Sequence, residues 1–179
     1  EVSEEVEKNF KKSGIKITKG VKVSKIQSMK QNAKVFLEKK ASDEIIKAEK
    51  VLLAVGVTGN INNLGLDDLG IETEAGAIKT DNFNRTNIEN IYAIGDVCGP
   101  PWLAHVASAQ GHLAAEHSAG LNVNPIDYSN IPGCTYCQPQ VGSLGMTEEQ
   151  ALSSGFKVKV GRFSFQASGK AVSYTHLRA

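Results

Sequence analysis

The stretch TNIENIYAIGD, residues 86–96, is the most specific signal in the chain. Its apolar end, residues 91–94, predicts a short buried strand that delivers Gly95 and then Asp96 at its carboxyl end. Open α/β sheets bind ligands at that edge. Gly95 lets a ligand approach the backbone because it has no side chain, and the Asp96 carboxylate can accept a hydrogen bond from a sugar-like hydroxyl. The alternative is a plain Gly-Asp turn that caps the next helix.

The complete string resembles the second flavin-binding motif of flavoproteins with two dinucleotide-binding domains, T-x-x-x-x-I-Y-A-x-G-D. This resemblance implies that Asp96 holds the ribityl chain of FAD and that Gly95 lies beside the cofactor. An isolated Gly-Asp pair would not carry that implication, whereas the whole string of residues 86–96 favours it over a plain turn.

The next segment, PWLAH at residues 101–105, opens an alanine-rich helix predicted over residues 103–119. A helix N-terminus presents N–H groups without intrahelical acceptors and partial positive charge, which would stabilise the negative charge of a reduced flavin. In the dihydrolipoamide dehydrogenase family a Met-Leu-Ala-His-like sequence has this role. The matching residues here are Trp102, Leu103, Ala104 and His105, with Trp102 at the position where methionine is commonest. For His105, an ordinary helix-start residue is the alternative.

Residues 51–57 (VLLAVGV) form a near-continuous apolar run, which predicts a strand covered on both faces, as in a parallel sheet. A buried strand followed by a glycine turn explains this run without any ligand. The resemblance implies more, because the run matches the family's link out of the pyridine-nucleotide domain. There, the glycine matching Gly56 comes close to NAD. Many relatives have arginine and proline after this glycine, whereas this chain has Val57, Thr58 and Gly59.

Cys134 and Cys137 form a C-x-x-C pair, which can be a redox disulfide or half of a zinc site. A redox pair normally opens a helix, but this pair is predicted on a strand, where a spacing of three sends side chains to opposite faces. There is no second C-x-x-C and no nearby histidine pair for a metal, so we predict a structural role and no metal site. The surrounding residues 131–141 resemble the opening of the family's interface domain, with Cys137 replacing a threonine and Gln140 a glutamate.

The predicted fold class is α/β followed by α+β. Residues 1–58 are expected to finish a Rossmann-like NAD-binding domain, after an amphipathic helix at residues 1–13. Residues 59–128 are expected to form a central region that returns to the FAD domain, and residues 129–171 to begin an α+β dimerisation domain. The last eight residues, 172–179 (VSYTHLRA), resemble a translated sequencing adapter, so we expect them to be non-native.

Two details are predicted within residues 129–171. Thr147, with Gln150 three residues later, has the pattern of a capping box and predicts the start of a helix. A strand is predicted over residues 157–163.

Bulk composition excludes several classes of protein. Twenty basic and 19 acidic residues give a net charge of +1, and no polybasic run indicates nucleic acid or a membrane surface as a partner. The longest apolar runs are too short to span a bilayer. Three cysteines are too few for a disulfide scaffold, so a reducing, cytoplasmic compartment is expected.

The resemblance implies a flavoenzyme that oxidises dihydrolipoamide with FAD and NAD. It also implies a homodimer that acts on the lipoyl domain of a 2-oxo acid dehydrogenase complex. The family's C-x-x-x-x-C disulfide and both G-x-G-x-x-G fingerprints are missing from the sequence, and its His-Glu acid–base pair would lie downstream. We therefore expect no catalytic residue in this chain, no turnover and no tight FAD binding by the chain alone.

Two alternatives remain open from the residues. The first is a glutathione-reductase-like or mercuric-reductase-like flavoprotein, because these share the Gly-Asp flavin motif. The second is a non-catalytic subunit-contact module that uses the strands predicted over residues 134–163, with no flavin contact at Asp96.

Overall fold

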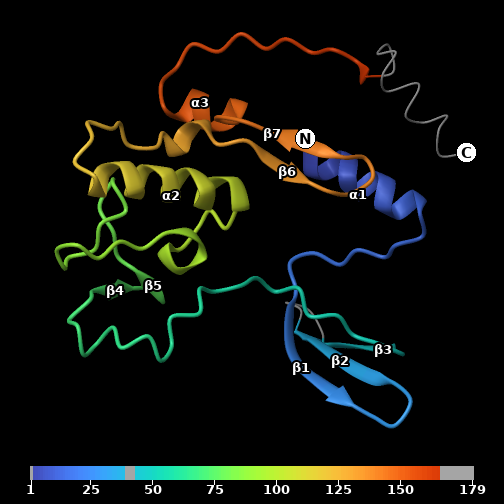
Figure 1. Cartoon of the computed structure of the whole chain (residues 1–179). Coiled ribbons are helices and arrows are strands. Elements are labelled where there is room, and N and C mark those ends of the chain that lie inside the picture. Colours follow the sequence, from blue (N-terminus) through green and yellow to red (C-terminus); the bar gives the residue numbers. More distant parts are fainter. Residues whose placement is uncertain (1, 39–42, 166–179) are drawn as a thin grey trace, which may run out of the picture. The chain divides into compact units, whose positions relative to one another are not determined.

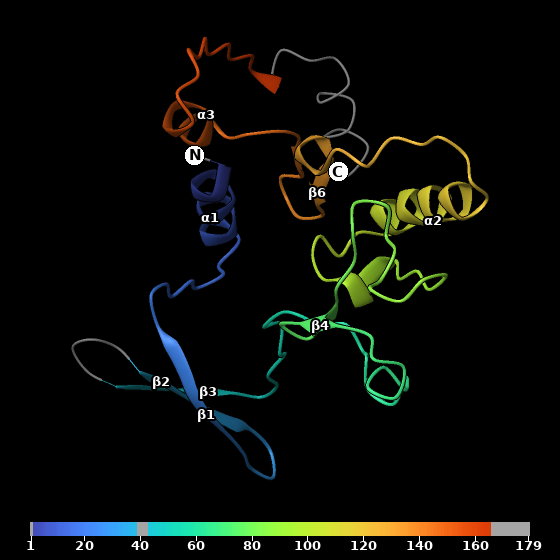
Figure 2. The same ribbon diagram turned by 90° about the vertical axis from the view of Figure 1, so that its left-hand side faces the viewer.

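The computed structural model describes residues 2–38 and 43–165. The chain forms two compact units, Glu1–Tyr128 with Cys134–Gly142, and Ser129–Gly133 with Ser143–Ala179. Figures 1 and 2 show the elements, which are described unit by unit. The suspected adapter sequence at residues 172–179 lies outside the described residues, so its origin stays a prediction.

The chain begins with helix α1, Val2–Lys12, which confirms the predicted amphipathic helix. Acidic residues occupy its first turn and lysines its last, as the helix dipole favours. Gly14 ends it with a φ of 82°. The Gly14 N–H donates to the Lys11 carbonyl and the Ile15 N–H to the Phe10 carbonyl, both at 3.0 Å. These bonds form a Schellman motif, which requires a left-handed residue that glycine supplies most easily.

Three antiparallel strands follow: β1 (Lys22–Ser28), β2 (Ala33–Glu38) and β3 (Glu44–Ala48), in the order β1-β2-β3. Their register pairs Ile26 with Val35 and Phe36 with Ile45. A bulge interrupts β1 between Val23 and Lys25. The central strand β2 holds the one buried side chain of this sheet, Leu37, among the residues described.

The predicted strand over residues 51–57 is wrong. The segment has no regular secondary structure, and Leu52 and Val55 are 90% and 89% exposed. A strand needs neighbouring strands that satisfy its backbone and cover its faces. No described strand pairs with this segment. The apolar side chains of this segment are suited to burial, but in this chain no neighbouring strand within the described residues covers them.

The central region contains the short hairpin of β4 (Thr73–Glu74) and β5 (Ala77–Ile78), then the 3-10 turn η1 (Gly95–Cys98), helix α2 (Ala104–Ser118) and the turn η2 (Tyr128–Asn130). The helix predicted over residues 103–119 is therefore confirmed. The strand predicted over residues 91–94 is reduced to one bridge between Arg85 and Tyr92.

One small apolar cluster holds this region together. Its buried members are Ile71, Ile78 and Ala93, with Ile61, Leu66, Ile88, Ile91, Val97 and Cys98 packed against them. The cluster draws on residues both before and after β4 and β5. It therefore fixes the segment of residues 86–98 on which the candidate site depends.

Beyond η2, β6 (Gly133–Thr135) and β7 (Val141–Ser143) form a two-stranded sheet, followed by helix α3 (Glu148–Ser153). The predicted capping box is confirmed, because the Thr147 hydroxyl accepts from the Gln150 N–H and the Gln150 side chain accepts from the Thr147 N–H. The strand predicted over residues 157–163 is wrong: the segment is irregular and Phe163 is exposed. As at residues 51–57, no described strand pairs with it.

None of the helices within the described residues combines the length and apolar character that crossing a bilayer requires.

Candidate functional site

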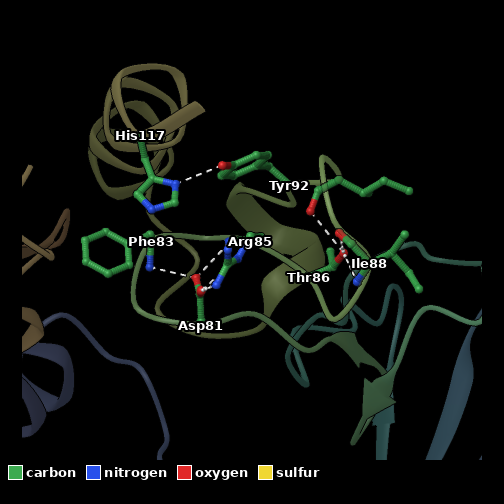
Figure 3. Close-up of polar contacts among 8 residues, drawn as sticks. Asp81, Phe83, Arg85, Thr86, Ile88, Tyr92 and His117 are labelled. Carbon is green, nitrogen blue, oxygen red and sulfur yellow. Dashed lines mark hydrogen bonds and ion pairs between the residues drawn. The ribbon is translucent and has the colours of Figure 1, made fainter. Parts of the chain in front are cut away.

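A hydrogen-bonded loop at residues 81–85 leads into the motif at residues 86–96 (Figure 3). The Asp81 carboxylate accepts from the backbone N–H groups of Phe83 (2.9 Å) and Arg85 (3.0 Å), and from the Arg85 guanidinium at 3.2 Å. Partial burial raises the pKa of Asp81, but the Arg85 and Phe83 amides and the Arg85 charge together hold that pKa below its usual value. The charged carboxylate is therefore part of the loop's structure.

Thr86 closes the turn that follows. It is buried, and its hydroxyl accepts from the Ile88 N–H at 3.1 Å and lies 3.0 Å from the Ile91 carbonyl. The Thr86 N–H donates to the same Ile91 carbonyl. Buried Asn84 adds a second link, because its carbonyl accepts from the Ala93 N–H at 3.0 Å. The conformation of residues 84–93 is thus set by bonds made inside this one segment.

Aromatic contacts tie this loop to the last turn of α2. The Tyr92 hydroxyl and His117 Nδ1 share a hydrogen bond of 2.8 Å. Phe83 stacks on the His117 ring with 4.6 Å between ring centroids and 17° between planes. Figure 3 shows His117 reaching from the helix toward both residues. One end of α2 is therefore fixed against the segment that precedes Gly95.

The Gly95–Asp96 turn follows directly. Gly95 has a φ of 74°, and a Cβ there would also meet the Ala107 Cβ at 3.4 Å. Its N–H donates to Gln110 Oε1 at 2.7 Å. Asp96 lies in η1 with an exposed side chain, and its carbonyl accepts from the Gly99 N–H. Gly95 is therefore half-buried against α2, and the turn presents the exposed Asp96 carboxylate, an acceptor that suits a hydroxyl-bearing ligand.

The N-terminus of α2 is the second element of the candidate site. Leu103 is the N-cap residue and provides no side-chain hydrogen bond, because its side chain has no acceptor. Its carbonyl accepts from the N–H groups of Val106 and Ala107 at 3.0 Å each. The Ala104 amide precedes the first of these bonds, so it is directed out of the helix end. His105 and Trp102 are exposed at this end. The helix can thus stabilise an anion with backbone groups.

Gln110 is a functional candidate that the sequence analysis missed. Its side chain is 6% exposed, and it joins the Gly95 N–H to the Tyr128 hydroxyl, to which Nε2 donates at 2.8 Å. A signal was present in the sequence: Gln110 stands at helical spacing within an apolar stripe. The other members of the stripe are Val106, Leu113 and Ala114. A buried amide in such a stripe requires partners.

The two glycines at residues 56 and 59 have different surroundings. Gly56 has a φ of 104°, is exposed, and no heavy atom would lie within 4 Å of a Cβ placed there. A Cβ on Gly59 would lie 2.7 Å from the Asp96 carbonyl oxygen and 2.9 Å from the Val97 Cα. The structure therefore brings Gly59 to the Asp96 turn, and it does not bring Gly56 there.

A cleft of about 510 Å³ lies beside this contact, lined among others by Gly59, Cys98 and Trp102. Burial raises the pKa of the Cys98 thiol to about 11. The thiol is therefore protonated near neutral pH, and since the thiolate is the reactive form, Cys98 is not an activated nucleophile.

Cys134 and Cys137 are both free thiols. The premise that both stand on one strand is wrong, because β6 ends at Thr135 and the Cys137 N–H bonds back to the Thr135 carbonyl at 3.1 Å. Cys137 Sγ lies 3.0 Å from the Pro139 carbonyl, which it can donate to. The alternation of strand faces therefore applies to Cys134 only, and the structural role of the pair stays a prediction.

Two family sequence models match the chain. The model described as "Pyridine nucleotide-disulphide oxidoreductase" matches residues 1–111. The model of the dimerisation domain of the same family matches residues 131–178.

Curated relatives agree with these matches. The dihydrolipoyl dehydrogenase of Rhizobium etli is 45% identical over 97% of this chain, and that of Chlorobaculum parvum is 48% identical over 99%. The chain spans only 36% and 38% of the length of these two relatives. The predicted resemblance to dihydrolipoamide dehydrogenases is thereby confirmed.

Solved structures show the same fold. LpdA from Mycobacterium tuberculosis has a TM-score of 0.85 at 22% identity, over 94% of this chain and 36% of its own. The HOCl-induced flavoprotein disulfide reductase RclA from Escherichia coli has a TM-score of 0.82 at 23% identity, over 94% of this chain and 38% of its own. These likenesses and the family matches confirm the predicted fold class of α/β followed by α+β.

Proposed function

Since the chain belongs to the pyridine nucleotide-disulphide oxidoreductase family, we propose that it is part of a dihydrolipoyl dehydrogenase and carries one half of its FAD site. The whole protein would oxidise dihydrolipoamide to lipoamide and reduce NAD⁺. Relatives with that name at 45% and 48% identity support this choice over a glutathione-reductase-like or mercuric-reductase-like enzyme.

The residues present fit the cofactor. Asp96 offers an exposed acceptor for a ribityl hydroxyl, and the absence of a side chain at Gly95 lets the turn pack against Ala107 of α2. The N-terminus of α2 offers amides and partial positive charge next to an apolar N-cap, Leu103. The observation that carries the proposal is the 2.7 Å hydrogen bond from the Gly95 N–H to Gln110 on α2, which joins these two elements.

When bound, FAD would supply a two-electron carrier between a dithiol and NAD⁺. Asp96 would orient the ribityl chain through a hydrogen bond that is strong because its acceptor is charged. The amides at the start of α2 would favour negative charge nearby and so raise the reduction potential of the cofactor. Leu103 and Trp102 would cover the apolar surface of the ring system, with His105 beside them.

Several further assignments belong to the same proposal. Residues 1–58 would complete the NAD-binding domain, with Gly56 near NAD in the whole protein, and residues 59–128 would return to the FAD domain. Residues 129–171 would begin the dimerisation domain of a homodimer, supported by the match at residues 131–178. The reducing equivalents would come from the lipoyl domain of a 2-oxo acid dehydrogenase complex. A cytoplasmic location remains a prediction.

The test is Asp96→Ala in the whole protein, with FAD content and the Kd for FAD as readouts. Loss of a hydrogen bond to a charged acceptor costs about 1.5 to 3 kcal/mol, so the Kd should rise roughly ten- to hundredfold. Asp67→Ala is the matched control, because it removes another exposed carboxylate of the same unit and should leave the Kd unchanged. Equal flavin content in wild type and Asp96→Ala would favour the non-catalytic module.

The 179-residue chain by itself is proposed to be inactive and to bind FAD weakly, because the sequence contains neither a C-x-x-x-x-C disulfide nor a G-x-G-x-x-G loop. Purification of residues 1–171 tests this directly. A stoichiometric yellow flavin that stays bound through purification would contradict it.

A further inference from the structure

Gln110 is the buried polar residue whose bond to Gly95 joins the two elements of the candidate site. The proposed function gives its side chain no further role. Its side chain is 6% exposed and sits in the apolar stripe of α2. Burying an amide in such surroundings costs free energy unless its oxygen and its nitrogen both find partners. The two partners it has, Gly95 and Tyr128, lie 15 residues before it and 18 residues after it. Hydrogen bonds between residues so far apart in the sequence hold the Gly95 turn and the Tyr128 segment against α2.

The chemistry of the partners determines how the amide is oriented. The backbone N–H of Gly95 can only donate, so Gln110 must direct Oε1 toward it, at 2.7 Å. Nε2 then faces the other way and donates to the Tyr128 hydroxyl at 2.8 Å. The orientation is therefore set at the glycine end, and Tyr128 stabilises it from the other side.

This bond holds a backbone that would otherwise have several conformations. Gly95 has a φ of 74°, in a region that glycine populates about as readily as the right-handed one. Fixing its N–H against a helix selects one conformation of the turn. Because Asp96 is the next residue, the same bond sets the direction from which its carboxylate leaves the turn.

The acceptor stands on the helix whose first residue is Ala104. A helix is stiff over the short stretch from Ala104 to Gln110, which are six positions apart. Anchoring the turn at Gln110 therefore fixes Asp96 relative to the amides at the start of α2. The two halves of the candidate site become one rigid unit.

We propose that Gln110 is a positioning residue of the FAD site, which holds the Gly95–Asp96 turn against α2 so that the carboxylate and the helix N-terminus act on the same cofactor. The inference rests on the proposed function, since it presumes FAD at Asp96. Gln110 itself touches no substrate, and its effect passes through the turn.

The experiment uses the whole protein and compares Gln110→Met with Leu113→Val. Gln110→Met keeps the length of the side chain but loses both hydrogen bonds. Leu113 is buried on the same helix face and has no bond to the turn, so its truncation reports on packing alone. For each variant, the Kd and the dissociation rate of FAD and the Tm of the apoprotein are measured.

Gln110→Met is expected to raise the Kd for FAD about tenfold, because it loses both of the neutral hydrogen bonds that Gln110 makes. Leu113→Val should lower the apoprotein Tm while the Kd stays within about twofold of wild type. Gln110→Glu should restore affinity, because a carboxylate accepts from both the Gly95 N–H and the Tyr128 hydroxyl. Tyr128→Phe, which keeps the Gly95 bond, should raise the Kd only about threefold.

The proposal is overturned if Gln110→Met binds FAD as wild type does. It is also overturned if Leu113→Val lowers the apoprotein Tm by the same amount as Gln110→Met and raises the Kd for FAD by the same factor. If Gln110→Met fails to fold, Gln110→Glu and Tyr128→Phe are used instead. The positioning role is contradicted if Tyr128→Phe binds FAD as wild type does while Gln110→Glu loses affinity for FAD.

Asp96→Ala distinguishes a failure of the positioning role from a failure of the proposed function. If it lowers FAD affinity while the Gln110 variants do not, positioning by Gln110 is wrong and the proposed function stands. If Asp96→Ala has no effect, the proposed function itself fails.

Discussion

Residues 51–55 (VLLAV) and residues 91–94 (IYAI) are both short apolar runs followed by a glycine, yet they have opposite surroundings. In the first, Leu52 is 90% exposed and Val55 89% exposed. In the second, Ala93 is 8% exposed and belongs to the apolar cluster with Ile71 and Ile78. Both runs have the apolar composition of a strand, so composition does not explain why one is exposed and the other is buried.

Backbone partners explain it. The N–H of Ala93 donates to the Asn84 carbonyl, and the carbonyl of Ile91 accepts from Thr86. These two backbone partners lie nine and five residues away along the chain, whereas residues 51–55 have no strand among the described residues to pair with. A polar backbone can be buried only where its N–H and C=O groups are bonded. An apolar run is therefore buried where the same chain also supplies its hydrogen bonds.

Truncation of one large side chain in each region gives the largest expected contrast. Ile78→Ala should destabilise the cluster by about 2 to 4 kcal/mol, because it leaves a cavity in a packed core. Leu52→Ala in the same 179-residue chain should change stability by less than about 0.5 kcal/mol, because that side chain is exposed. The hydrogen-exchange rate of the Ala93 amide is measured in both variants. It should rise in Ile78→Ala and stay unchanged in Leu52→Ala. An equal change in both variants would contradict the difference between the two regions.

A methyl group at Gly59 should have the next largest effect. The added Cβ would lie 2.7 Å from the Asp96 carbonyl oxygen, so the backbone must move. Gly59→Ala is expected to cost about 1 to 3 kcal/mol, as overpacking does. The Gly99 amide, bonded to that carbonyl at 3.2 Å, should exchange faster.

The control for Gly59→Ala is Gly142→Ala, since no atom lies within 4 Å of a Cβ there. This variant should leave the Gly99 amide unchanged. If Gly59→Ala were equally silent, the contact between Gly59 and the Asp96 turn would not exist in solution.

Removal of the Thr86 hydroxyl tests the local bonds. Thr86→Val keeps the shape of the side chain but loses the bonds to Ile88 and Ile91, so the turn should lose about 1 to 2 kcal/mol. The Ile88 amide should become exchangeable on the timescale of local opening, because its acceptor is gone. A protected Ile88 amide in Thr86→Val would mean that packing alone holds the turn.

Acid should produce the smallest effect, through Asp81. Its pKa is lower in the folded chain than the ordinary value of 3.8. The stabilisation it contributes is therefore complete above that ordinary value and is lost as the pH falls through the lowered folded pKa. The Tm difference between wild type and Asp81→Asn should accordingly shrink below about pH 4. A constant difference across that range would contradict a structural role for the charged carboxylate.

Elements with local causes were predictable. Helix α1 follows from its amphipathic spacing, and the capping box at Thr147 follows from two residues three apart. The turn at Gly95–Asp96 and the helix start at Leu103 also lie where the motifs place them. All of these depend on residues within one or two turns of each other, whose periodicity and chemistry a sequence displays directly.

Elements with distant causes were not predictable. The strand expected over residues 51–57 failed because it depends on pairing partners, and the contact of Gly59 with Asp96 spans 37 residues of chain. Gln110 could have been suspected as a polar residue in an apolar stripe, but its partners could not be named. Cys137 was misplaced on a strand because β6 ends at Thr135, two residues before it.

The sequence by itself therefore determined the family, the segment of residues 86–96 that resembles a flavin-binding motif, and the helix that follows it. Only the tertiary structure decided that Gly95 and Asp96 are held to that helix through Gln110, and that Gly59 packs on the same turn. The physical reason is the range of the interactions. Helix periodicity and capping act between neighbours along the chain, whereas hydrogen bonding and close packing between segments depend on where the folded backbone places them.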